Sequence, residues 1–490
     1  MNLPEIIQGG MGVGVSNWTL ARAVSSAGQL GVVSSTGIDT VFVRRLQDGD
    51  PGRHMRLALD HFPIPEVAER VLNKYFREGG IGEDTPYRTS SSGSIEASRE
   101  WEELLMVANF SEVFLAKWGH CREVGINLLE KIQLPTLPSL FGALLAGVDY
   151  VLMGAGIPRA IPGVLDKLSS GQAADLKIDV KGASATDNFF SNFNPGRFFS
   201  SHMPEMKRPR FLGIITSHVL AQSLATKADG HVDGFVVEGP TAGGHNAPPR
   251  GPMTLDARGE PIYGLRDEPD LEKIRQIGRP FWIAGSYGNP DGLVKAKEAG
   301  AAGVQIGTAF AFCNESGMQS GIKASIIDSC RRKIANVFTD SRASPTGFPF
   351  KVFSVEGTMS EESDYLARKR VCDLGYLRHL FKKEDGSVGY RCPAEPVDIY
   401  VKKGGDIADT EGRKCLCNGL MATIGLGQKR RGGNNEKPII TVGDTVKSTV
   451  VALAGERSSY SASDVLRYMR SKITGEAYIA KVEEPVAVEV

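Results

Sequence analysis

The most informative stretch of this chain is VDGFVVEGPTAGGHN, residues 232–246. Its first part, Val232 to Glu238, is β-branched and aromatic and predicts a short buried strand. A histidine follows the paired glycines after this strand, where parallel α/β barrels hold their chemistry. An imidazole there titrates near neutral pH, and Gly243 and Gly244 leave room for a flat ring system to approach the main chain. The pattern predicts His245 as a catalytic acid or base; the alternative is a turn histidine that caps a loop.

Short apolar runs with glycine-bearing turns recur from the start of the chain to about residue 310. Eight are present, at 6–10, 30–35, 124–129, 149–156, 211–216, 232–238, 281–285 and 303–308. Helix-like segments separate several of them, and Asn17 is expected to cap a helix over residues 18–27. Eight strands that alternate with helices predict an α/β fold, a closed parallel (β/α)8 or TIM barrel, because consecutive parallel strands need right-handed helical crossovers. An open doubly wound sheet is the alternative.

Three stretches do not fit this alternation. Residues 40–120 carry helical patterns around a polar loop, and residues 157–208 are rich in Gly, Asn, Ser and Phe. We expect both to be long insertions at the barrel rim, where long loops tend to be functional. The alternation ends after the last strand, so residues 1–330 are expected to form the barrel. Residues 331–490 are expected to form a C-terminal extension, a lid or subdomain followed by terminal helices.

Composition excludes several classes of function. The 57 basic and 57 acidic residues cancel, so nothing indicates nucleic acid or an anionic membrane surface as a partner. The first residues lack a signal-peptide pattern, and no stretch of about 18 apolar residues occurs. Seven cysteines are too few for a disulfide framework, which fits a reducing compartment. We therefore expect a soluble cytoplasmic protein, and the sequence leaves its oligomeric state open, a homodimer included.

Two glycine turns after the seventh and eighth strands predict a phosphate site. They are Gly285-Ser286 and Gly307-Thr308. In this fold the loops after these strands commonly hold a phosphate through main-chain N–H groups that small residues leave uncovered. The alternative is that each glycine merely ends its strand. A phosphate site beside a central histidine favours a phosphorylated cofactor that carries a ring.

The glycines of residues 9–14, GGMGVG, come between a strand and a helix and suggest a dinucleotide-binding fingerprint. The G-x-G-x-x-G spacing is not met from Gly10 or Gly12, and no acidic residue closes a strand at the expected distance. Close approach of the main chain to a flat ligand explains these glycines better.

Several of these segments together resemble the nitronate monooxygenase family, formerly called 2-nitropropane dioxygenases, which also includes flavin-dependent enoyl-thioester reductases. The segments are 7–12, 125–127, 154–156, 242–245, Gly285 and 303–308, and they cover roughly residues 1–36 and 120–325 in the family's order. The resemblance implies a barrel that binds FMN at its carboxyl-terminal mouth, with His245 as the catalytic acid or base. It places the phosphate at Gly285, Ser286 and the segment Gln305 to Thr308, the isoalloxazine near Gly9, Gly10 and Met11, and a hydrogen bond to the ring at Asn127. The full set of expected cofactor contacts is Gly9, Gly10, Met11, Asn127, Gly154, Gly243, Gly244, Gly285, Ser286, Gln305, Gly307 and Thr308.

The expected activity is an FMN-dependent oxidation of a small-molecule substrate, an alkyl nitronate, with molecular oxygen as co-substrate. Pro240, Pro248 and Pro249 should make the loop around His245 stiff and dry, which suits a small, weakly hydrated substrate.

The alternative within the family is an NAD(P)H-dependent enoyl-thioester reductase, and the insertions could build a groove for its acyl chain. A flavin-binding barrel without turnover is a second alternative. An IMP-dehydrogenase-like enzyme would need a loop cysteine where this chain has His245. The residues around His245 and the long insertions depart from the family pattern, so the substrate is less determined than the cofactor.

Four cysteines fall within the extension, Cys372, Cys392, Cys415 and Cys417. They could hold zinc or an iron–sulfur cluster. The usual C-x2-C pair is absent, however, and buried single cysteines often act as small apolar residues. We therefore predict no metal site.

Overall fold

The computed structural model describes residues 3–90, 93–200, 202–430 and 435–480. Parts of the expected extension, residues 431–434 and 481–490, lie outside the described residues.

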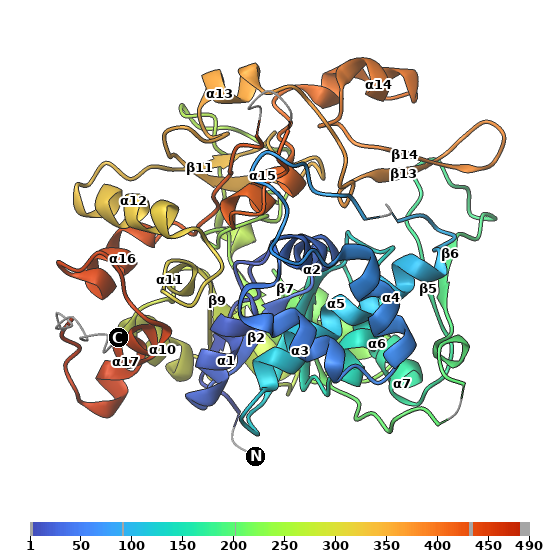
Figure 1. The fold of residues 1–490 in the computed structure, drawn as a ribbon. Coiled ribbons are helices and arrows are strands. Elements are labelled where there is room, and N and C mark those ends of the chain that lie inside the picture. The colour runs from blue at the N-terminus through green and yellow to red at the C-terminus, as the bar shows by residue number, and fades with distance from the viewer. Residues whose placement is uncertain (1–2, 91–92, 201, 431–434, 481–490) are drawn as a thin grey trace.

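Eight parallel strands form the centre of the molecule (Figure 1). They pair in the order β1-β10-β9-β8-β7-β4-β3-β2, and a parallel bridge between Ile7 and Leu30 joins the two ends of this series. The backbone N–H of Gln8 donates to the Leu30 carbonyl at 2.9 Å, which closes the sheet next to the bridge. The predicted (β/α)8 barrel is confirmed, and the open sheet is wrong. The strands are β1 (Ile6–Gln8), β2 (Gly31–Ser34), β3 (Val124–Leu129), β4 (Tyr150–Gly154), β7 (Arg210–Ile215), β8 (Gly234–Glu238), β9 (Phe281–Ala284) and β10 (Gly303–Ile306).

Alternate residues of each strand face opposite sides, as strand geometry requires. Inside the barrel, a small apolar cluster includes Ile7, Val32 and Trp282, all buried. Outside it, neighbouring residues such as Ile6 and Val33 belong to a much larger core shared with the helices. Both faces are covered, which explains why the strands read as continuous apolar runs rather than alternating ones.

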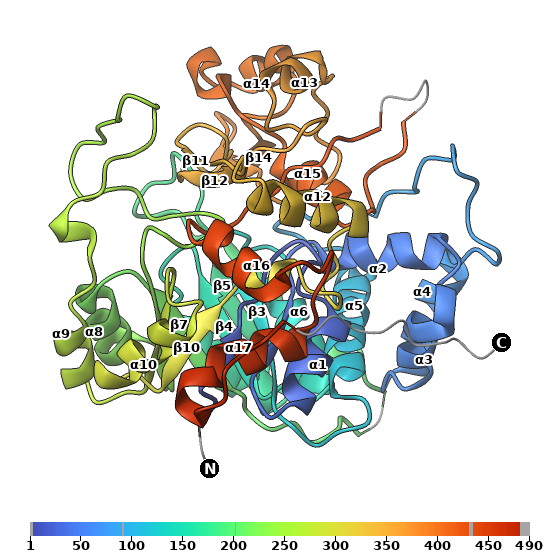
Figure 2. The same ribbon diagram turned by 90° about the vertical axis from the view of Figure 1, so that its left-hand side faces the viewer.

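Helices surround the barrel between the strands (Figures 1 and 2). The cap expected at Asn17 is present, since its side chain accepts a hydrogen bond from Leu20 N–H at 2.9 Å. None of the helices in the described residues is long and apolar enough to cross a membrane. The helices through the end of the barrel are α1 (Trp18–Ser26), α2 (Ile38–Gln47), α3 (His54–Asp60), α4 (Pro65–Tyr75), α5 (Arg99–Lys117), α6 (Thr136–Leu145), α7 (Ile161–Ser169), α8 (His218–Lys227), α9 (Leu271–Gln276), α10 (Pro290–Glu298), α11 (Thr308–Ala311) and α12 (Ser320–Arg331).

Further elements lie outside the eight-stranded sheet. Helices α3 and α4 precede α5, and β5 (Ala174–Lys177) pairs antiparallel with β6 (Phe190–Phe193). After α12 the chain forms two more antiparallel pairs and the remaining helices, drawn in orange and red in Figure 1. Helix α17 returns to pack against α1 and α10, and its N-terminus is capped by Ser461. These last elements are β11 (Val337–Asp340), β12 (Phe350–Phe353), α13 (Glu362–Ala367), β13 (His379–Lys382), β14 (Val388–Arg391), α14 (Val397–Lys402), α15 (Leu416–Thr423), α16 (Val446–Ala454) and α17 (Ala462–Thr474).

Candidate functional site

The turns after the first and last barrel strands lie together at the mouth. The N–H of Gly9 donates to the carbonyl of Ile306 at 2.8 Å, next to Gly307. A Cβ added to Gly307 would stand 3.4 Å from the Met11 sulfur. The structure therefore brings together Gly9, Met11 and Gly307, which the sequence predicted as parts of one cofactor surface.

Asn127 and Gly10 contact each other across the mouth. A Cβ on Gly10 would lie 2.2 Å from the Cβ of Asn127, so the main chain passes too close for any other residue. Gly154, by contrast, packs within the barrel: a Cβ there would lie 2.7 Å from Ile214. A role for Gly154 in cofactor binding stays a prediction.

The loop that carries His245 is held by two segments of the chain beyond residue 330. On one side, His245 and Phe350 form an antiparallel bridge, and the N–H of Asn246 donates to the Pro349 carbonyl at 2.9 Å. On the other side, the N–H of Gly244 donates to the Thr441 hydroxyl at 2.7 Å. The position of His245 is therefore fixed by contacts that reach far along the chain.

The His245 ring is half-buried, and its Nε2 lies 2.7 Å from the hydroxyl of Ser344. The ring also meets Phe350 edge-on, with 4.9 Å between the centroids. Burial lowers the pKa of His245 to about 4. The imidazole is therefore neutral at pH 7, with one nitrogen engaged by Ser344 and Nδ1 left for a ligand.

Thr241 and Thr308 organise the predicted phosphate site. The Thr241 hydroxyl accepts from Ser286 N–H at 3.2 Å, which fixes the turn after β9. The Thr308 hydroxyl accepts from Gly443 N–H at 2.9 Å and can still donate its own hydrogen to an anion. The sequence identified Ser286 and Thr308 but missed Thr241 and Gly443.

Three acceptors at the mouth lack a partner among the described residues. The side-chain oxygens of Gln305 and Asn246 are buried without a hydrogen bond, and the Glu238 carboxyl has none assigned either. Glu238 and Asn246 line a common cavity of about 110 Å³. Buried acceptors without donors are rare in folded proteins, so Gln305 Oε1 and Asn246 Oδ1 call for a donor, from a ligand or from water. The half-buried Glu238 carboxyl is instead open to the cavity.

These observations fit the FMN that the sequence resemblance implies. The ribityl hydroxyls and ring N–H of a flavin are donors for the unpartnered oxygens. A Cβ added at Gly239 or Gly244 would meet no described atom within 4 Å, so open main chain faces the mouth there. The 110 Å³ cavity is too small for the whole cofactor, so a flavin would lie across these open glycines rather than inside it.

Glu238 is a candidate functional residue that the sequence analysis did not select. Glu238 is the last residue of β8, directly before Gly239. An acidic residue at the carboxyl end of a buried barrel strand is a sequence feature from which this candidate could have been predicted. Burial raises the pKa of Glu238 to about 7. The carboxyl can therefore gain or lose a proton near neutral pH.

Replacing Glu238 by glutamine should stabilise the protein selectively at high pH. The folded pKa lies above the unfolded one, so the stability that the protonated carboxyl supplies below pH 4.5 is lost as pH rises through 7. Relative to the original chain, Glu238→Gln should gain about 1–3 kcal/mol in free energy of unfolding between pH 5 and pH 8. Urea unfolding at both pH values measures this gain. The exposed Glu298→Gln serves as control, and an equal gain in both variants would contradict the assignment.

The four cysteines of the C-terminal region lie in one group. Cys372, Cys392, Cys415 and Cys417 contact one another around Ala394. Within the ranges that the structure describes, no three His, Cys, Asp or Glu side chains are arranged to hold a metal ion. Burial and the neighbouring thiols raise the pKa of Cys392 and Cys417 well above the usual range. Cys392 and Cys417 are therefore protonated at neutral pH, whereas the hydrogen bond with Cys392 lowers the pKa of Cys372.

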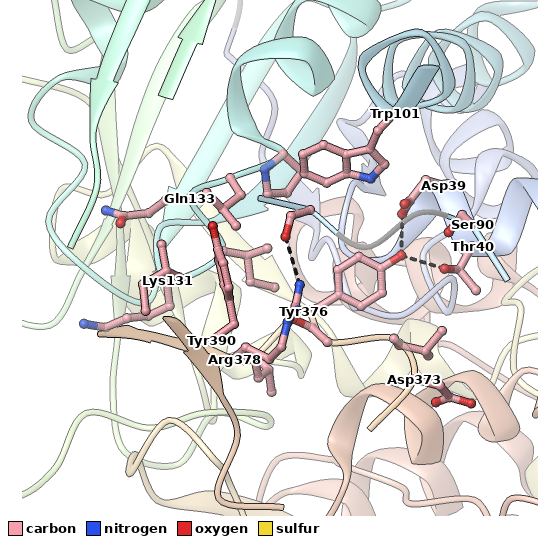
Figure 3. A pocket seen from close by; sticks show the side chains of 18 of the residues that line it. Asp39, Thr40, Ser90, Trp101, Lys131, Gln133, Asp373, Tyr376, Arg378 and Tyr390 are labelled. Carbon is pink, nitrogen blue, oxygen red and sulfur yellow. Dashed lines mark hydrogen bonds between the residues drawn. The ribbon is translucent and has the colours of Figure 1, made fainter. Parts of the chain in front are cut away.

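A larger cavity of about 420 Å³ lies beside the mouth (Figure 3). It is lined by residues of the segments 39–101, 179–181 and 373–390 and by the loop 131–135 that follows β3. Thr346, which also lines it, is hydrogen-bonded to Ser344 at 2.8 Å. The cavity therefore adjoins the residue that holds His245.

The strand pairing defines a (β/α)8 barrel, and the glycine turns, the unpartnered acceptors and the fixed histidine lie at its carboxyl-terminal mouth, where this fold binds its ligands. Residues 205–341 match the family model of nitronate monooxygenase. This segment is less than a third of the chain, but it contains β7 to β10 and therefore His245 and both glycine turns. The predicted resemblance is confirmed over these residues. A comparison with curated proteins finds no match.

Solved structures that are similar to this chain include FabK, a nitroalkane oxidase and an enoyl reductase domain. FabK from Thermotoga maritima is 15% identical, with 96% of this chain and 94% of that chain covered and a TM-score of 0.46. Nitroalkane oxidase from Streptomyces ansochromogenes is 14% identical, with 96% of each chain covered and a TM-score of 0.45. The enoyl reductase domain of MlnA from Bacillus amyloliquefaciens is 9% identical, with 97% of each chain covered and a TM-score of 0.45. At this level of similarity the barrel assignment rests on the strand pairing itself.

Proposed function

We propose that the protein is an FMN-dependent oxidoreductase that oxidises alkyl nitronates, with molecular oxygen as co-substrate. The observation that carries the proposal is a neutral His245 fixed at the mouth, inside the segment that matches the nitronate monooxygenase family. In such a barrel the strand ends supply the ligand contacts, and the protein binds, orients and excludes water.

Different residues at the mouth would bind different parts of the cofactor. Thr308 and the turn at Gly285 and Ser286 would hold the phosphate, since Thr241 and Gly443 already fix their geometry. Gln305 would accept from a ribityl hydroxyl through its unpartnered oxygen. The isoalloxazine would lie near Gly9, Gly10 and Met11, with Asn127 in hydrogen-bonding reach. Gly244 would leave space for it, whereas Gly243 packs against the main chain, since a Cβ there would lie 2.7 Å from the carbonyl carbon of Val442.

FMN would supply the redox chemistry when bound, a two-electron oxidation of the substrate at the expense of molecular oxygen. His245 would hold its proton at Nδ1, the ring nitrogen left to face the substrate, because Nε2 is engaged by Ser344. Ser344 orients the ring, and Phe350 packs against it on the apolar side. Asn246, bound to the Pro349 carbonyl, keeps the loop closed over this space and limits the entry of water.

We expect the purified protein to be yellow and to contain FMN that acid releases. The reason is the convergence of two glycine turns and two unpartnered amide oxygens, Gln305 Oε1 and Asn246 Oδ1, at one mouth. An absorption spectrum and a fluorescence titration with FMN measure it. A colourless protein that does not bind added FMN would remove the basis of the proposed function.

A second candidate is an enoyl-thioester reductase that takes electrons from NAD(P)H. The 420 Å³ cavity favours it, because a nitronate of a few carbons does not need a chamber of that size. The match of residues 205–341 to the nitronate monooxygenase family model favours the first candidate.

A further inference from the structure

The cavity of about 420 Å³ has the size of a small-molecule site. Figure 3 shows Tyr376 directed at Asp39 and Thr40, with Trp101 above them and Lys131 and Gln133 on the opposite side. Tyr376 hydrogen-bonds to Asp39 and lies 2.7 Å from the Thr40 hydroxyl. At the inner end of the cavity, Tyr376, Asp39 and Thr40 therefore form a polar group that is hydrogen-bonded within itself.

The charges around the cavity favour an anion. Five lining side chains are cationic and three are carboxylates. Two of the carboxylates already have partners, since Asp39 binds Tyr376 and Asp373 pairs with Arg430 at 3.0 Å. The cations Arg44, Arg88, Lys131, Lys181 and Arg378 therefore outnumber the lining carboxylates. Asp373 also acts on Arg44, and Glu130, which does not line the cavity, acts on Lys131.

Two of these cations, Lys131 and Lys181, are exposed at the opening of the cavity. Neither forms an ion pair with any described residue, although the Lys131 ammonium lies 5.5 Å above the Phe348 ring. A charge at an opening can remain hydrated while it attracts an anionic group to the rim.

The walls behind this rim are apolar and aromatic. Leu374, Leu377 and Leu380 line one side, and Trp101 faces the interior from α5. Such a lining gains free energy by burying hydrocarbon rather than a second charged group. The cavity therefore has a cationic opening and an apolar and aromatic stretch of wall, beside the polar group of Tyr376, Asp39 and Thr40.

The cavity also connects to the mouth of the barrel. Thr346 lines it, its hydroxyl lies 2.8 Å from that of Ser344, and Ser344 is 2.7 Å from His245. A bound molecule at Thr346 would therefore be two hydrogen bonds away from the histidine.

We propose that this cavity binds a linear alkyl or acyl chain with an anionic head group, the head at Lys131 and Lys181 and the chain between Trp101 and the leucines. Carboxylate and phosphate heads share the required chemistry. The proposal concerns binding alone and does not depend on the redox reaction.

Isothermal titration of the full-length protein with decanoate, decyl phosphate and decan-1-ol tests it. We expect at least one of the two anions to bind more tightly than the alcohol, with an affinity that falls as salt is added. The anion that binds more tightly identifies the head group. The double variant Lys131→Met/Lys181→Met should weaken anion binding by about fivefold to tenfold and leave decan-1-ol unchanged.

Matched variants locate the site. Lys383→Met removes an exposed lysine of the β13–β14 turn that does not line the cavity, and it should bind the anions as the original chain does. Leu380→Trp should block all three probes, and Leu380→Phe replaces it if the larger side chain prevents folding. Bound probe should also change the tryptophan fluorescence, and Trp101→Phe should remove that change. Absence of binding by both anions, or equal anion affinity in the double-lysine variant and the original chain, would overturn the proposal.

Discussion

Replacing His245 by alanine should lower kcat/KM for an alkyl nitronate by about 10²–10⁴, the usual contribution of a general acid or base. FMN binding should persist, because the loop is held through its main chain at Gly244 and Asn246 rather than through the ring. Ser344→Ala should give a smaller loss, since it frees the ring without removing it. Steady-state kinetics from pH 5 to pH 9 measures both effects.

The exposed His202→Ala is the control and should keep full activity. If His245→Ala retains the original kcat/KM across this range, the residue is a structural part of the loop. Loss of turnover with FMN retained would also exclude a flavin-binding barrel without activity.

Replacing Gly307 by leucine should reduce FMN affinity at least tenfold. The backbone φ of Gly307 is −103°, which other residues adopt readily, so the variant should fold. Its side chain would point at Met11 and fill the gap between the turns after β1 and β10, where the cofactor is expected. Fluorescence titration with FMN measures the loss.

Gly321→Leu is the matched control, because a Cβ at Gly321 meets no described atom within 4 Å and the residue lies on α12, away from the mouth. Equal FMN affinity in the two variants would mean that the flavin does not contact Gly307.

The strands and the barrel could be predicted because short buried apolar runs recur along the chain, and five of them, β1, β4, β8, β9 and β10, end at a glycine. Short apolar segments such as Phe281–Ala284 are recognisable without any partner, and the cap at Asn17 is a local signal. Once eight strands alternate with helices, few topologies remain. The mouth then follows, since parallel strands present their carboxyl ends on one side.

The contacts that hold the His245 loop at the mouth could not be predicted in the same way. Ser344 lies 99 residues from His245, and Thr441 lies 197 residues from Gly244. Neither side chain belongs to a motif, and their contacts depend on how the chain folds back after α12. The 420 Å³ cavity has the same origin, because its walls come from segments that meet only in the tertiary structure.

The arrangement of the four cysteines could not be predicted from the sequence either. Their spacing left open a metal site or isolated buried thiols, and the sequence could not tell whether Cys372 lies near Cys417. The structure gathers all four, yet without an arrangement for a metal ion in the described residues.

The most direct test of the proposed function is anaerobic stopped-flow mixing of the oxidised, FMN-loaded protein with propyl-2-nitronate, and separately with NADH and NADPH, while flavin absorbance is followed. We expect the nitronate to bleach the flavin at least as fast as steady-state turnover, and neither nicotinamide to do so on that timescale. Fast bleaching by a reduced nicotinamide, with none by the nitronate, would contradict the nitronate oxidation proposed here and establish the enoyl-thioester reductase as the better candidate.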